Sequence, residues 1–225
     1  MAIILSIESS GNICSVALHK NGELLAFIES DEPNIHSQKL AVFIKEICAI
    51  QNIEINKLSA IAVSEGPGSY TGLRIGVSIA KGICYASKLP LIAVDTLQSL
   101  ANASLIINEI TIKKNALLMP MIDARRMEVY LAGYDLNLKK IINTKPIILD
   151  TAFYNSITQP TYVFGNGALK IEKCNFNDNL IFIPEINFSA KHLGNIAFNK
   201  FISNQFENVA YFEPVYLKEF AVVLP

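Results

Sequence analysis

Two acidic residues that follow apolar runs, Glu8 and Asp123, are the side chains best placed to do chemistry. The loops at Ser9 and Gly66 could hold phosphate groups through their backbone N–H groups. Carboxylates at strand ends beside such loops would suit the binding of Mg²⁺ and a nucleotide. However, residues 124–126 read Ala-Arg-Arg and contain no glycine that would let the backbone approach a phosphate. A small Mg-ATP-dependent enzyme is therefore kept as the alternative function.

A glycine-rich turn lies between an apolar strand predicted at residues 60–64 and a helix predicted at residues 71–86. The spacing Gly66-x-Gly68-x-x-x-Gly72 is neither the dinucleotide fingerprint nor a phosphate loop. A turn that needs positive φ values explains these glycines at least as well as phosphate binding does. A structural turn is therefore favoured over an anion site. The candidate vestigial nucleotide or anion loop comprises Glu8, Ser9, Ser10, Gly66, Gly68 and Ser69.

The three histidines and four cysteines are scattered along the chain and form no C-x-x-C or H-x-x-x-H pattern. Metal sites built from these residue types need ligands at short spacing. We therefore predict free thiols, no metal site and no bound cofactor.

The predicted helix at 71–86 is apolar over most of its circumference. Gly72, Gly76, Ala80 and Cys84 recur every fourth residue and form a stripe of small side chains. A glycine inside a helix costs about 1 kcal/mol relative to alanine, so two of them indicate a compensating close contact. That contact could be with the chain's own sheet or first helix, or with a helix of a partner chain, and the sequence leaves both open.

The elements expected in the first half follow the order β-β-β-α-β-α-β, which is typical of a ribonuclease-H-like unit. They are strands at 2–9, 13–19 and 24–29, a helix at 36–50, a strand at 60–64, a helix at 71–86, a strand at 91–94 and a further helix at 96–107. An Asn-Gly turn at residues 21–22 predicts a hairpin between the second and third strands.

The second half begins in the same way, with strands expected at 116–123, 128–134 and 139–149. A shift of 115 residues places Glu8 on Asp123 and Gly22 on Asn137, which suggests a duplicated unit. We expect a first lobe at 1–107 and a smaller second lobe at 108–225. A short strand at 162–164 and a helix at 189–204 follow, and the C-terminal segment is expected to dock back on the first lobe.

The length, net charge and composition of the chain limit the class of protein. The 225 residues carry a net charge of −1, and 51% of them are hydrophobic. No apolar run reaches the roughly 18 residues that a membrane span needs, and the first residues lack the features of a signal peptide, so we expect a cytoplasmic chain without a membrane partner. Since no basic block is present, direct RNA binding by this chain alone is expected to be weak or local.

The chain resembles the bacterial TsaB (YeaZ) family in segments that run over most of its length: ILSIESSGNICSVAL, SEGPGSYTGLRIGVSIAKGICYASKLPLIAVDTLQSLA, MIDARRMEVYLAGYD, VFGNGA and EPVYLK. Glu8 stands where that family usually has Asp, and Asn166 stands where it often has an acid. The resemblance implies the α/β actin/Hsp70/sugar-kinase-like (ASKHA) fold of two ribonuclease-H-like lobes, with the second lobe reduced.

The resemblance also implies a function. Members of this family are non-catalytic partners of the TsaD transferase in making N6-threonylcarbamoyladenosine (t6A) at position 37 of tRNAs that read ANN codons. TsaE is the third component, tRNA is reached only through the complex, and a homodimer is expected when the chain is alone. No catalytic residue is then expected here. The partner interface is implied to lie on the first two helices, which gives the candidates Leu40, Phe43, Ile44, Ile47, Gly72, Leu73, Ile75, Gly76, Ile79, Ala80 and Ile83.

Overall fold

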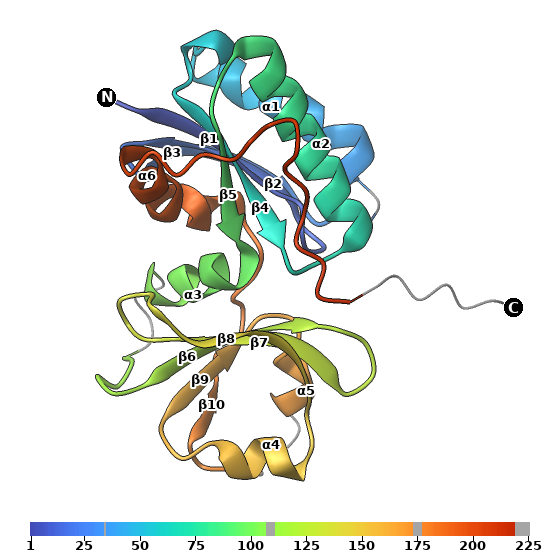
Figure 1. Ribbon diagram of the computed structural model, residues 1–225, viewed down its shortest axis with the longest axis vertical. Coiled ribbons are helices and arrows are strands. Elements are labelled where there is room, and N and C mark those ends of the chain that lie inside the picture. The colour runs from blue at the N-terminus through green and yellow to red at the C-terminus, as the bar shows by residue number, and fades with distance from the viewer. Residues whose placement is uncertain (34, 107–110, 173–176, 219–225) are drawn as a thin grey trace, which may run out of the picture.

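The protein folds around two five-stranded sheets, one in each lobe (Figure 1). The computed structural model describes residues 1–33, 35–106, 111–172 and 177–218. The first sheet has the order β3-β2-β1-β4-β5. Its strands are β1 (Ile3–Glu8), β2 (Cys14–Lys20), β3 (Glu23–Ser30), β4 (Ala60–Gly66) and β5 (Leu91–Asp95). Strands β1 to β3 pair antiparallel, whereas β1, β4 and β5 pair parallel.

The second sheet repeats this topology in the order β8-β7-β6-β9-β10. Its strands are β6 (Leu117–Asp123), β7 (Glu128–Tyr134), β8 (Lys140–Ile148), β9 (Thr161–Phe164) and β10 (Leu180–Phe182). Three antiparallel strands are again followed by two parallel ones. The two-lobed fold expected from the sequence is confirmed. The division at residue 107 stays a prediction, because residues 107–110 lie outside the described part.

Two long helices cover one face of the first sheet, and a later segment covers the other (Figure 1). Helices α1 (His36–Ile50) and α2 (Tyr70–Ser87) pack on the first face, with the short 3-10 helix η1 (Ile55–Lys57) between them in the chain. The opposite face receives η2 (Ala190–Leu193) and α6 (Gly194–Ile202), which return from the second lobe. Helix α3 (Thr96–Ile106) lies between the two sheets. The face of the second sheet away from α3 carries the short helices α4 (Thr151–Ser156) and α5 (Leu169–Glu172).

Local chemistry explains where these elements begin and turn. The hairpin between β2 and β3 is built on Asn21 and Gly22, with φ values of 51° and 92°, as the Asn-Gly pair predicted. The Ser69 hydroxyl accepts a hydrogen bond from Gly72 N and so caps α2. Helix α1 spans the predicted residues 36–50, and α2 extends the predicted 71–86 by one residue at each end.

The prediction of an α-helix at residues 189–204 is wrong for the first turn, and the predicted helix extends too far at its C-terminal end. Residues Ala190–Leu193 form a 3-10 helix, and α6 runs only from Gly194 to Ile202. Other elements occupy the carbonyls of this turn: His19 Nε2 donates to Lys191 O at 3.2 Å, and Asn102 Nδ2 donates to His192 O at 2.8 Å. These carbonyls are tied to side chains of β2 and α3, which favours a tighter turn.

The alignment of the two halves by a shift of 115 residues is also wrong. It pairs positions of β1 and β6 whose side chains point to different faces of their sheets. In β1, Leu5 and Ile7 face the core under α1 and α2, while Ile4 faces α6. In β6, Met119 and Met121 face the core shared with α4 and α5. Because side chains alternate along a strand, an odd shift puts equivalent positions on opposite faces. Glu8 and Asp123 are therefore not structural counterparts.

Candidate functional site

The carboxylate of Glu8 is enclosed by hydroxyl groups of its own lobe. Its Oε1 accepts hydrogen bonds from Ser10 N at 2.7 Å, from Ser10 Oγ at 2.5 Å and from Ser64 Oγ at 2.9 Å. The side chain is 1% exposed. Burial raises the pKa of this carboxyl, and the hydrogen bonds from Ser10 and Ser64 oppose the rise. The acid at the end of β1 is thus satisfied internally rather than open toward a ligand.

The other members of the predicted anion loop lie around Glu8, so the structure brings all six residues together. Ser69 N donates to Ser10 O at 2.7 Å, which joins the turn before α2 to the loop after β1. A Cβ at Gly68 would lie 2.5 Å from the same Ser10 carbonyl, so only glycine fits there. Gly66 has φ of +113°, a conformation that favours glycine. Two backbone donors of this cluster, at Ser10 and Ser69, bind protein acceptors, which supports the structural interpretation of the turn.

Asp123, the second acid singled out in the sequence, has partners of its own in the second lobe. Its Oδ1 accepts from Lys170 Nζ of α5 at 2.7 Å and from Arg125 N at 2.6 Å. Its own backbone N–H donates to Asn166 Oδ1 at 2.9 Å. The Gly-Asn-Gly turn after β9 therefore holds the end of β6 through the side chain of Asn166. No group of three or more His, Cys, Asp or Glu side chains within the described ranges is arranged to hold a metal ion.

The stripe of small residues on α2 packs against the chain's own first strand. A Cβ at Gly72 would overlap Ser9 O, and a Cβ at Gly76 would overlap Ser9 Oγ. Ser9 Oγ also donates to Gly72 O at 2.9 Å, so strand and helix are joined at this point. Of the two contacts left open by the sequence, the one with the protein's own sheet is present.

Seven of the eleven predicted interface residues are buried inside the first lobe. They are Leu40, Ile44 and Ile47 of α1, and Gly72, Leu73, Gly76 and Ala80 of α2. Their side chains pack on the sheet as core, so contact with a partner through these seven residues stays an untested prediction. The remaining four, Phe43, Ile75, Ile79 and Ile83, pack against this core and stay partly exposed.

The C-terminal segment limits how much of α2 is accessible. Lys81 Nζ donates to Phe212 O at 2.8 Å, and Arg74 Nε donates to Tyr216 OH at 3.2 Å. The Tyr216 ring lies 4.9 Å from the Tyr70 ring, measured between centroids. The sequence predicts that the C-terminal segment docks on the first lobe but not where, because a hydrophobic pattern does not identify carbonyls as acceptors for Lys81.

Asp95 at the end of β5 was missed by the sequence analysis. Its Oδ1 accepts from Leu97 N and Gln98 N and so caps α3, while its Oδ2 accepts from Lys140 Nζ of β8 at 2.6 Å. Tyr134 OH of β7 also donates to Oδ2, at 3.4 Å. An acid directly before an apolar helix is a recognisable N-cap. Its second role is to link the lobes. This role depends on Tyr134 and Lys140, which lie 39 and 45 positions further along the sequence.

The chain is similar to known proteins of one family. The family model described as "TsaD: tRNA N6-adenosine threonylcarbamoyltransferase" matches residues 33–222. The chain is 30% identical over 225 residues to the tRNA threonylcarbamoyladenosine biosynthesis protein TsaB of Buchnera aphidicola subsp. Baizongia pistaciae, a match that covers 96% of this chain and 98% of that protein. The chain belongs to the TsaB family.

Other members of the TsaB family match over a shorter stretch. The Escherichia coli (strain K12) protein TsaB is 36% identical over 133 residues, which are 58% of this chain and 54% of that protein. The matched part thus spans about half the length of that relative. Among solved structures, "YeaZ from Pseudomonas aeruginosa" superposes with a TM-score of 0.80 at 24% identity, over 96% of this chain and 100% of that one, and supports the fold. Across the described residues, no helix is both long and apolar enough to cross a bilayer.

Proposed function

We propose that this chain is a non-catalytic subunit in the formation of t6A at position 37 of tRNAs that read ANN codons. It binds and stabilises the TsaD transferase, and TsaE is the third component. The names of the relatives support this role, since they are tRNA threonylcarbamoyladenosine biosynthesis proteins. The match to the transferase family model supports a partner of related fold.

The observation that carries the proposal is the partly exposed apolar surface of α1 and α2, formed by Phe43, Ile75, Ile79 and Ile83. On the same helices, Ile50 is 69% exposed and Tyr85 is 83% exposed. Apolar side chains that stay accessible next to a well-packed core are typical of an interface. Two chains of related fold can pair through the same helices about a pseudo-twofold axis. The same surface would form the homodimer when the chain is alone.

The burial of Glu8 and the ion pair of Asp123 support a non-catalytic role. The Glu8 carboxylate is surrounded by Ser10 and Ser64, and Asp123 is paired with Lys170. An Mg-ATP-dependent enzyme would need these carboxylates to face a bound metal and phosphates. With a net charge of −1, the chain also offers no broad electrostatic attraction for tRNA, so tRNA is bound through the complex.

Size-exclusion chromatography with light scattering tests this function, on the chain alone and mixed with the TsaD protein of the same source. We expect a one-to-one complex with the wild-type chain and its loss with Ile79→Arg. Ile202→Arg is the matched control, because Ile202 is an exposed isoleucine at the end of α6. Equal complex formation by both variants would contradict the interface. Hydrolysis of Mg-ATP by the pure chain that is lost on Glu8→Ala would instead favour the enzyme alternative.

A further inference from the structure

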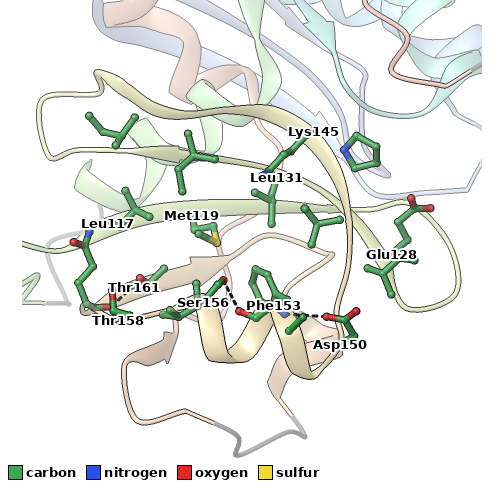
Figure 2. Close-up of a pocket in the computed structure, with 18 residues that line it drawn as sticks. Leu117, Met119, Glu128, Leu131, Lys145, Asp150, Phe153, Ser156, Thr158 and Thr161 are labelled. Carbon is green, nitrogen blue, oxygen red and sulfur yellow. Dashed lines mark hydrogen bonds between the residues drawn. The ribbon is translucent and has the colours of Figure 1, made fainter.

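The second lobe contains an apolar cavity of about 710 Å³ between its sheet and α4 (Figure 2). Leu117, Met119 and Leu131 reach into it from the sheet, and Phe153 reaches into it from α4. Glu128 and Asp150 stand at one end (Figure 2). Its size lies within the range of roughly 300 to 1,000 Å³ that is usual for ligand pockets.

The cavity exists because the helices of the second lobe are short. In the first lobe, the connections after β3 and β4 contain α1 and α2, of 15 and 18 residues. The equivalent connections, after β8 and β9, contain α4 and α5, of 6 and 4 residues. Part of this face of the second sheet is therefore uncovered, and Ile148 of its outer strand is 61% exposed.

The described part of the C-terminal segment ends at the rim of this cavity. Val215 N donates to Glu65 O at 2.8 Å, which holds the segment beside the end of β4 in the first lobe. Three residues later, Lys218 Nζ forms a salt bridge with Glu128 Oε2 of the second lobe. Glu128 is itself a wall residue of the cavity. The chain thus passes from one lobe to the other and reaches the cavity at Glu128.

The residues that follow Lys218 have the composition of an occupant for this space. Residues 219–225 lie outside the described part and read EFAVVLP, so a single acid precedes six apolar residues. Seven extended residues span about 23 Å at roughly 3.3 Å each. Crossing from β8 to β9 takes three strand spacings of about 4.8 Å, or about 14 Å. The segment is therefore long enough to cross the cavity from the Glu128 end.

We propose that residues 219–225 dock in this cavity as an internal ligand, with Phe220 and Leu224 as the apolar anchors. Burial of these side chains against Met119, Leu131 and Phe153 supplies the driving force. The Lys218–Glu128 ion pair sets the point of entry. In this arrangement the C-terminal segment contacts α2 of the first lobe and fills the uncovered face of the second.

Photo-crosslinking of the full chain tests the docking directly, with Val222→p-benzoylphenylalanine. We expect a cross-link within one chain that maps to β7, β8 or α4. Lys218→Glu should lower its yield, and the charge-exchanged pair Lys218→Glu with Glu128→Lys should restore it. A cross-linked dimer, a cross-link to the first lobe, or no cross-link would overturn the proposal.

A dye that fluoresces in apolar pockets, 1-anilinonaphthalene-8-sulfonate, gives a second measurement. The variant Phe220→Asp with Leu224→Asp should expose the cavity and raise dye fluorescence several-fold over the wild-type chain. Tyr211→Asp is the matched control, since Tyr211 is 84% exposed in the same segment and lies away from the cavity. Equal fluorescence of the double variant and the wild type would show that another molecule, or nothing, fills the cavity.

Discussion

The hydroxyl oxygen of Ser9 occupies the space that a side chain at Gly76 would need. This contact joins the end of β1 to the middle of α2, and a second bond, from Ser9 Oγ to Gly72 O, strengthens it. The glycines of α2 thus serve the packing of the lobe itself, and the proposed partner surface lies on the half-exposed side chains around them.

Gly76→Ala is expected to destabilise the protein. The new Cβ would displace Ser9 and break its bond to Gly72, and overpacking of this kind costs about 1 to 3 kcal/mol. Gly82→Ala is the control, since a Cβ at Gly82 would meet no atom within 4 Å. That substitution should stabilise the helix by up to about 1 kcal/mol. Urea unfolding of both variants measures the two effects, and equal signs would refute the explanation.

Asp95→Ala should cost more stability than Lys140→Met. The aspartate both caps α3 and pairs with Lys140, whereas the lysine caps no helix and adds to the pair only an exposed hydrogen bond to Thr144 Oγ1 at 3.1 Å. An N-cap is worth about 1 kcal/mol. The ion pair adds at most about 1 kcal/mol, because the Lys140 side chain is 35% exposed. Asp95→Asn should keep the cap and fall between the two in thermal unfolding. A loss with Lys140→Met as large as that with Asp95→Ala would contradict this division.

Acid should destabilise the fold through His19. Burial lowers the pKa of this side chain to about 4, against an ordinary value of 6.5, and its hydrogen bond to the Lys191 carbonyl opposes the shift only in part. The unfolded chain binds the proton first, so stability is full above pH 6.5 and falls as the pH drops toward 4, by roughly 2 to 3 kcal/mol.

His19→Gln should flatten the dependence of the unfolding free energy on pH between 6.5 and 4. Some slope should remain, because burial also lowers the pKa of His192 to about 4. Urea unfolding at several pH values measures this slope, and identical slopes in the variant and the wild type would exclude His19 as the group responsible.

Glu8 should have the opposite dependence on pH. Burial raises the pKa of its carboxyl above the ordinary 4.5, so the folded state holds a proton that the unfolded chain has released. Its contribution is full below pH 4.5 and is lost as the pH rises through the raised pKa. Glu8→Gln should therefore gain stability relative to the wild type as the pH increases. Glu8→Asp, which keeps an acid, should show no such gain, and a gain in both variants would argue against titration of Glu8.

Much of the fold could be predicted from short-range patterns. The Asn21-Gly22 turn, the apolar runs of the parallel strands and the periodicity of residues 36–50 each depend on neighbours in the sequence, and all three appear in the structure. The partners of Glu8 and Gly76 could not be predicted in this way. Ser64 lies 56 residues from Glu8, and Ser9 contacts Gly72 across 63 residues. Periodicity shows that a helix face is apolar, but not whether a sheet or another chain covers it.

The return of α6 to the first sheet has a consequence for synthesis on the ribosome. One face of that sheet, with Ile4 of β1 and Ile92 of β5, is covered by Leu193, Ile196 and Ala197. The strands emerge early, but their cover emerges only after the whole second sheet has been translated. During synthesis, the first lobe therefore exposes an apolar face to solvent until α6 has been translated. Chaperones bind hydrophobic surface that is exposed in this way.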